Sequence, residues 1–240
     1  MNAQAVFDRL FGAGGHNVAS DGLFLHGSAK VGGNSVTVIG TIDHAAIDGL
    51  LALRIADAIL QTVQADAAAG TPPRPIIFIA DTQGQALSRH EELLGLNGYF
   101  AHVARCVDLA RRHGHRLLTL INGEAVSGGF MAYGLLADRI CALPDAQVRV
   151  MDLRAMSRVT KIGLERLEEL AGVSPVFAPG AENYWRMGGI HEIWSADDSW
   201  PERLAAALSR ASDADDRAAI GLERDGRQLA ATTAQLVRDA

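Results

Sequence analysis

The sequence LLTLINGEAVSGGFMAYGLLAD, residues 117–138, is the stretch around which the chain is organised. Its apolar run Leu117–Ile121 predicts a buried strand, and Phe130–Leu136 returns to helical spacing. Between them lie Asn122-Gly123-Glu124 and Ser127-Gly128-Gly129. Glycine lets the backbone approach a ligand because it has no Cβ, and the first N–H groups of a helix lack an intrahelical partner. The stretch therefore predicts a strand–turn–helix unit that binds an anion, a carbonyl or an oxyanion, with tight packing of small residues as the alternative.

A second strand ends in a polar segment of the same kind. The run PIIFIA at 75–80 is continuously apolar, which is typical of a strand buried on both faces, and DTQGQ follows it. Helical patterns at 45–69 and 91–112 alternate with these strands, and such alternation favours parallel strands with crossover helices. Ligands bind at the carboxyl ends of parallel strands. We therefore expect the loops 81–90 and 122–129 to face one site.

The remaining sequence predicts further elements around this core. They are a hairpin from 23–29 and 35–42, a strand-like stretch at 139–151 interrupted at Pro144, short helices at 163–170 and 181–188, a small strand at 191–194, and helices in 201–240. With no repeat or linker, we expect one α/β domain over residues 1–240, in which 195–240 form a helical extension.

Composition excludes several classes of partner. The net charge of -6 over 240 residues argues against nucleic acid or an anionic membrane as the main partner. No apolar run reaches the roughly 18 residues that span a bilayer, and the N-terminus lacks signal-peptide features, so we expect a cytoplasmic protein. Gly12, Gly14 and Gly15 follow no strand and do not predict a dinucleotide site. Cys106 and Cys141 have no ligand-spaced neighbour and predict core residues rather than a metal site.

The two glycine segments resemble the crotonase superfamily, and within it the carboxyltransferase subunits of acyl-CoA carboxylases. Those proteins have an Asp-Thr-Pro-Gly loop and a later Gly-Glu-Gly-x-Ser-Gly-Gly turn. The matching residues are Asp81-Thr82-Gln83-Gly84 and Gly123-Glu124-Ala125-Val126-Ser127-Gly128-Gly129, with departures at Gln83 and Ala125. Residues 22–194 are more closely similar to the gamma subunits of biotin-independent malonate decarboxylases.

This resemblance implies a crotonase-like ββα-superhelix that works in a hetero-oligomer. The implied partners are a homologous beta subunit, an acyl carrier protein and an alpha subunit that exchanges acetyl for malonyl on the carrier. The malonyl thioester is carried on a dephospho-CoA-type prosthetic group of that carrier. No cofactor is expected on this chain itself, and neither biotin nor a metal. The beta–gamma pair is expected to release carbon dioxide and leave the acetyl thioester.

The resemblance also implies the site residues. Loss of carbon dioxide places charge on the thioester oxygen, and one backbone N–H donor to such an oxygen typically contributes roughly 10²–10³ in rate. The catalytic positions carried over by motif are Gly84, Gly128 and Gly129, while Gln83, Gln85 and Ser127 are candidates to bind substrate. Which donors face the thioester, and which the departing carboxylate, stays open.

Two other functions fit parts of the sequence. A serine hydrolase would use Ser127, since Ala125-Val-Ser127-Gly-Gly129 is one substitution from G-x-S-x-G and Asp152 and His191 follow in triad order. A non-catalytic scaffold would only complete its partner's pocket. Lys161 is expected to be a solvated lysine, with contact to the carrier's phosphates as the alternative.

Overall fold

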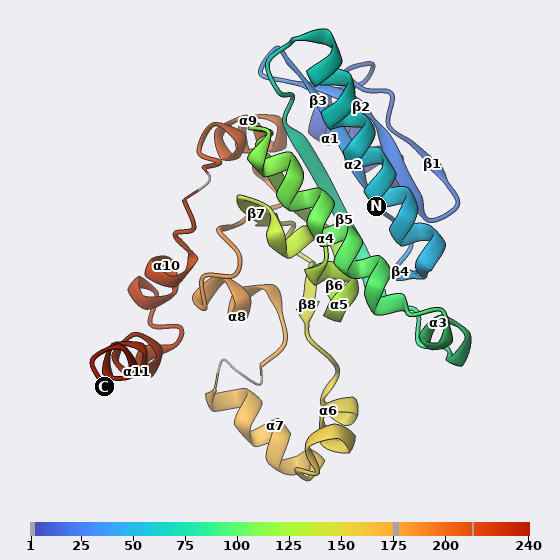
Figure 1. Ribbon diagram of the computed structural model, residues 1–240. Helices are drawn as coiled ribbons and strands as arrows, with labels where there is room; N and C mark the ends of the chain where they lie inside the picture. Colours follow the sequence, from blue (N-terminus) through green and yellow to red (C-terminus); the bar gives the residue numbers. More distant parts are fainter. Residues whose placement is uncertain (1–2, 175–177, 213) are drawn as a thin grey trace.

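The computed structural model describes residues 3–174, 178–212 and 214–240. A nine-stranded sheet crosses the described residues, with helices on both of its faces (Figure 1). The strands are β1 (Ala19–Asp21), β2 (Phe24–Val31), β3 (Asn34–Thr41), β4 (Ala45–Ile47), β5 (Ile76–Gln85), β6 (Leu117–Val126), β7 (Arg139–Ala142), β8 (Gln147–Arg149) and β9 (Glu192–Ile193). The α/β prediction is confirmed.

The helices of the described residues fall into two groups along the chain. Those before β7 are α1 (Ala3–Phe11), α2 (Gly49–Ala69), α3 (Arg89–Leu93), α4 (Leu96–Arg112), α5 (Ser127–Met131) and the 3₁₀ turn η1 (Gly134–Leu136). Those after β8 are α6 (Leu153–Thr160), α7 (Leu164–Val173), α8 (Ala181–Arg186), α9 (Trp200–Ser209), α10 (Arg217–Glu223) and α11 (Gln228–Arg238).

The sheet is antiparallel at one edge and parallel through its centre. Its strand order is β1-β2-β3-β5-β6-β7-β9, with β4 beside β5 and β8 beside β6. The predicted hairpin is β2–β3, closed by Gly32 and Gly33 at φ of 56° and 85°. Two successive positive φ values suit a two-residue hairpin turn, because its twist matches that of the strands. From β3 onward the neighbouring strands run parallel.

The central strands are buried on both faces, as their continuous apolar runs predicted. Ile76 and Phe78 of β5 pack in a cluster with residues of α2 and α4, whereas Ile77 and Ile79 pack in a second cluster with α1 and α9. Figure 1 shows α2 and α4 side by side over the sheet. This alternation follows from the period of two in a strand. The two clusters hold the carboxyl ends of β5 and β6 in fixed positions.

Much of the two segments predicted to be loops after the central strands is β-strand in the structure. β5 continues through Gln85 and β6 through Val126. Each extension gains a short neighbour, since Thr82–Gln85 pair with β4 and Glu124–Val126 pair with β8. Local polarity suggested loops, but pairing with strands distant in sequence supplies backbone partners that a local pattern does not reveal.

Several element boundaries differ from the sequence expectations. The first three residues of the predicted helix 45–69 form β4, and Asp48 caps α2 by accepting a hydrogen bond from the Leu51 N–H at 2.7 Å. Gly95, at φ 73°, divides the predicted helix 91–112 into α3 and α4. Helices α1 and α6 were not predicted. Helix α6 has no buried residue, and its apolar positions Leu153, Met156 and Val159 span only two turns, so the periodicity is too short to predict a helix with certainty from sequence.

The C-terminal region both completes the core and extends from it. Trp200 and Leu204 of α9 are buried in the second cluster, while α11 has no buried residue. In Figure 1, α10 and α11 lie away from the sheet, at the C-terminal end of the chain. None of the described helices is both long enough and apolar enough to cross a membrane.

Candidate active site

The ends of β5 and β6 come together beside the start of α5, as the two predicted loops required. Thr82 of β5 pairs with Ala125 of β6 across a register shift. An ideal Cβ built on Gly129 would lie 2.7 Å from the Gly84 carbonyl carbon, and one built on Gly84 would lie 3.2 Å from the Ser127 Cβ. Real Cβ atoms need more room than this, so only glycine at these two positions permits such close approach.

Asp81 links the end of β5, on which it lies, to the end of β6 and to the segment before β4. Its buried carboxylate accepts hydrogen bonds from the Glu124 N–H at 2.9 Å and the His44 N–H at 3.2 Å. The Nδ1 atom of His44 lies 2.9 Å from the same carboxylate. A Cβ on Gly123 would lie 2.3 Å from Asp81 Oδ1, so Gly123 leaves room for this contact. Neither His44 nor this role of Asp81 was predicted, because the pairing joins residues far apart in sequence.

Gly84 contributes to the site because it has no side chain, which lets neighbouring backbone approach closely. Its φ of 102° lies in a region that favours glycine. Its N–H donates to the Thr82 Oγ1 at 3.0 Å, and the Thr82 hydroxyl lies 2.6 Å from the Ala45 carbonyl oxygen. The Gly84 N–H is therefore engaged inside its own segment. The role of Gly84 as an oxyanion-hole donor therefore stays a prediction. The geometry favours another role, in which the absent side chain of Gly84 leaves room for Gly129 and Ser127.

The turn into α5 presents backbone N–H groups. Val126 occupies the N-cap position, and its hydrocarbon side chain offers no acceptor to the first turn. Ser127 has a φ of 51°, which is uncommon for a residue with a side chain. Such backbone conformations concentrate where a site is held in a special geometry. The N–H groups of Gly128 and Gly129 lie in the first turn of α5, where a helix has no internal partner for them.

The two glutamines differ in their surroundings. Gln83 is exposed on β5, whereas Gln85 is half-buried and its Oε1 atom is buried without a hydrogen-bond donor among the described residues. That oxygen lies 3.3 Å from the position of a Cβ on Gly128. A buried acceptor without a donor costs about 1–3 kcal/mol. Gln85 therefore fits a substrate-binding role better than Gln83 does.

Two neighbouring polar groups already have partners. Glu124 pairs with Arg149 of β8 at 3.0 Å, which ties β8 to the end of β6. Tyr133 is buried, and its hydroxyl lies 3.0 Å from the Thr41 Oγ1. Burial raises the pKa of Tyr133 above its usual range, so the phenol stays protonated. Neither group is positioned as a free base.

The structure does not assemble a Ser–His–Asp triad. Nδ1 of His191 accepts the Ile140 N–H at 3.0 Å, and Nε2 lies 3.2 Å from Asp216 Oδ1. Asp152 caps α6 by accepting the Ala155 N–H at 2.7 Å. Burial is the main cause of the lowered pKa of His191. Both ring nitrogens are occupied away from Ser127, so the hydrolase alternative is wrong. The described residues also contain no metal-binding cluster of His, Cys, Asp or Glu.

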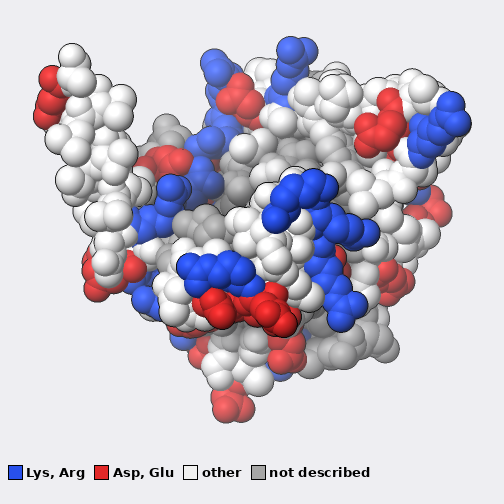
Figure 2. Space-filling view, turned by 90° about the horizontal axis from the view of Figure 1, so that it is seen from below, with Lys and Arg blue, Asp and Glu red and all other residues white. Residues whose placement is uncertain are grey.

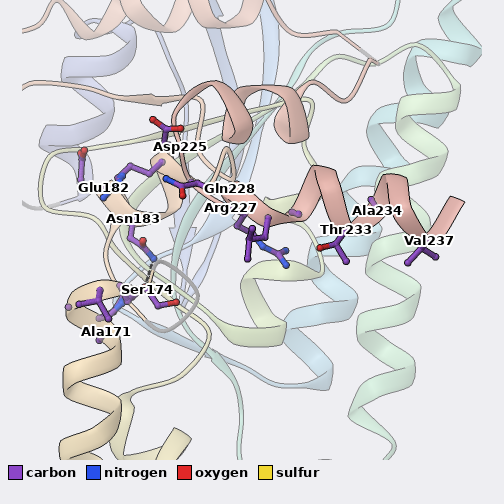
Figure 3. Close-up of a pocket in the computed structure, with 18 of the residues that line it drawn as sticks. Ala171, Ser174, Glu182, Asn183, Asp225, Arg227, Gln228, Thr233, Ala234 and Val237 are labelled. Carbon is purple, nitrogen blue, oxygen red and sulfur yellow. Dashed lines mark hydrogen bonds between the residues drawn. The ribbon is translucent and has the colours of Figure 1, made fainter. Parts of the chain in front are cut away.

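A large groove of the described surface lies elsewhere. A groove of about 1160 Å³ runs between α7, α8 and α11, and Figure 3 shows Asn183, Arg227 and Thr233 around it. None of the six predicted site residues is among its described lining residues. This groove is therefore separate from the strand-end candidate site.

Comparison with protein families identifies the chain. The model of the malonate decarboxylase gamma subunit, MdcE, matches residues 44–240. The chain belongs to the malonate decarboxylase gamma-subunit family. This membership confirms the resemblance carried by the segments 81–84 and 123–129, with Gln83 and Ala125 as this member's departures from the wider pattern.

A curated relative supports membership of this gamma-subunit family. The malonyl-S-ACP:biotin-protein carboxyltransferase MADD of Malonomonas rubra is 35% identical over 182 residues, which are 70% of this chain and 62% of that protein. The chain thus spans less than two thirds of the length of this curated relative.

Solved structures of similar fold come from the same family and from carboxyltransferases. A Pseudomonas malonate decarboxylase hetero-tetramer in complex with coenzyme A has a chain 25% identical, with a TM-score of 0.82 over 98% of this chain and 97% of that one. A chain of the Pseudomonas MdcD-MdcE hetero-dimer is also 25% identical and has a TM-score of 0.78, again over 98% of this chain and 97% of that one. Transcarboxylase 12S, 16% identical with a TM-score of 0.67 over 88% of this chain and 40% of its own, shares the fold. The crotonase-like expectation is confirmed.

Proposed function

We propose that this chain pairs with a homologous beta subunit and decarboxylates a malonyl thioester on an acyl carrier protein, leaving the acetyl thioester. The observation that carries the proposal is the turn at Ser127-Gly128-Gly129, which packs closely against Gly84 and begins α5 with N–H groups that have no intrahelical partner. The hetero-dimeric and hetero-tetrameric assemblies of its Pseudomonas relatives support a partner subunit.

The chemistry requires electrostatic stabilisation more than a proton-transfer group. Breaking the bond between the malonyl carboxylate and Cα leaves an electron pair that spreads onto the thioester oxygen as an enolate. The N–H groups of Gly128 and Gly129 donate to an oxygen of the reacting group, and such preorganised donors stabilise developing charge by several kcal/mol. A proton then adds to Cα and restores the thioester carbonyl. Gln85 orients the substrate by accepting, through its buried amide oxygen, a hydrogen bond from an amide N–H of the prosthetic arm.

The substrate arrives on a carrier in this scheme. The dephospho-CoA-type group of the acyl carrier protein presents the malonyl thioester, and an alpha subunit exchanges the product acetyl group for malonyl. This chain itself contributes the backbone turn and part of the pocket wall. A cytoplasmic setting suits such a cycle.

We expect the purified chain alone not to decarboxylate a malonyl thioester, because in this proposal the partner subunit excludes water from the site and supplies the second set of donors. Carbon dioxide release would be followed for each chain separately and for the reconstituted pair. Turnover only by the pair supports the proposal. Robust turnover by this chain alone would contradict the two-subunit proposal.

A second candidate function is carboxyl transfer to a biotin protein, favoured by the 35% identity to MADD. The enolate and its oxyanion hole are the same in both reactions, and only the acceptor of the carboxyl group differs. Avidin separates the two reactions, because it sequesters biotin. We expect avidin to leave the rate of carbon dioxide release unchanged. An avidin-sensitive reaction that depends on an added biotin protein would establish carboxyl transfer instead.

A further inference from the structure

Three basic side chains form a stripe along α6 and its C-terminal cap. Arg154, Arg158 and Lys161 are exposed, and no ion pair joins any of them to a carboxylate within the described part of the chain. Positions i, i+4 and i+7 lie within about 60° of one another around a helix. Figure 2 views the molecule from the side of α6 and α7, and Lys and Arg side chains gather near the centre of that face. These three residues are the basic stripe.

The charges of the basic stripe have no opposite charge to pair with in the isolated chain. Like charges four residues apart destabilise a helix by about 0.2–0.5 kcal/mol. Arg158 lies in the last turn of α6, where the helix dipole offsets this repulsion. The neighbouring α7 is acidic, and its Glu169 pairs with Arg166 of the same helix at 2.8 Å. Helix α6 and its cap thus carry three unpaired cations in a chain of net charge -6, and an anionic partner would relieve their repulsion.

The basic stripe begins close to the candidate active site. Arg149 of β8 pairs in register with Val126, the residue before the glycine turn. Asp152, three residues later, caps α6. The eight residues of α6 extend about 12 Å from that point. A macromolecule seated on α6 therefore has a short path from its own surface to the turn.

We propose that the basic stripe is the docking surface for the acyl carrier protein that presents the malonyl thioester. This inference rests on the proposed function. The arm that holds a carrier's thioester is joined through phosphate, so its attachment region is anionic and complements three unpaired cations. A carrier must bind and leave at each turnover, and exposed charge suits such a transient, salt-sensitive contact.

A permanent subunit contact would have a different composition. Cores of stable interfaces are apolar and depleted in lysine. Leu87, Leu93 and Leu94 form such an apolar segment and are 85%, 77% and 52% exposed. Val159 of α6 is also 70% exposed, but it lies about 100° or more around the helix from the basic stripe. The segment around α3 thus fits a subunit contact better than the basic stripe does, which leaves the stripe for the carrier.

The test compares two substrates of the assembled beta–gamma complex. One is the malonyl thioester on the acyl carrier protein, and the other is the malonyl thioester of N-acetylcysteamine, which has no carrier and no phosphate. The variants are Arg154→Glu with Arg158→Glu, and the milder Arg154→Gln with Arg158→Gln in case charge reversal impairs folding. The matched control is Lys30→Glu with Arg105→Glu, at exposed positions of β2 and α4 where neither side chain forms an ion pair with a carboxylate in the described part of the chain, and it changes the net charge equally.

We expect the ratio of kcat/KM for the carrier substrate to that for the short thioester to fall at least tenfold with charge reversal, and several-fold with glutamine. The fall should shrink at high salt and be absent in the control. An unchanged ratio, an equal fall in the control, or loss of the beta subunit from the complex would each overturn the inference. A wild-type complex that decarboxylates neither substrate would instead remove the proposed function, and this partner with it.

Discussion

Gly129→Ala is expected to lower the rate of decarboxylation by the assembled complex about 10²–10³-fold, the usual effect of losing an oxyanion-hole donor. The added Cβ would lie 2.7 Å from the Gly84 carbonyl carbon and 2.9 Å from its Cα. Both are backbone atoms with no flexible end to move aside. The strand end and α5 must therefore separate, and displacement of about 1 Å at a reacting centre alone costs on the order of 10²-fold.

The same substitution should reduce stability, because overpacking a close contact typically costs about 1–3 kcal/mol. Carbon dioxide release and thermal unfolding would be measured together. Gly98→Ala is the control, since no atom lies within 4 Å of a Cβ at that exposed position of α4. Near-wild-type turnover by Gly129→Ala would show that the packing of Gly129 against Gly84 does not shape the site.

Asp81→Ala is expected to destabilise the chain by about 3 kcal/mol, because buried or half-buried donors lose their acceptor at about 1–3 kcal/mol each. The donors are the backbone N–H groups of Glu124 and His44, at 2.9 Å and 3.2 Å. For a chain of this length the loss corresponds to a fall of about 6–12 °C in Tm. Asp81→Asn keeps one acceptor oxygen and should lose about half as much.

His44→Asn separates the role of the carboxylate from that of the imidazole. The His44 side chain is 63% exposed, so its ion pair with Asp81 contributes little. Asparagine also tolerates the positive φ of 51° at this position. We therefore expect a Tm change of only a few degrees. If His44→Asn lowered Tm as much as Asp81→Ala, the backbone hydrogen bonds would not be the main contribution of Asp81.

The sequence predicts best what local patterns determine. Continuous apolar runs at 75–80 and 117–121 identified two strands buried on both faces, and glycines at 128–129 identified the turn. The parallel strand order then predicted that both strand ends lie at one edge of the sheet. These inferences need only side-chain period and backbone freedom, which are properties of each segment by itself.

Contacts between distant segments were not predictable in the same way. The pairing of β4 with β5, and the hydrogen bonds from His44 and Glu124 to Asp81, join residues about forty positions apart. The engagement of the Gly84 N–H by Thr82 depends on a local bend at φ 102° that the motif does not specify. Helix α6 has only eight residues and none of them is buried, so its short apolar pattern is not tied to the core.

Gly128→Val in the assembled complex tests the central claim most directly. A side chain there meets the flexible Gln85 amide at 3.3 Å and Phe100 at 3.7 Å, so the chain should still fold and bind its partner. The valine methyl groups would cover the N–H groups of the turn. With assembly verified by size-exclusion chromatography and Gly98→Val as control, we expect carbon dioxide release to fall at least about 100-fold. An intact Gly128→Val complex that keeps half or more of the wild-type rate would contradict the account and leave this chain as a scaffold for its partner's site.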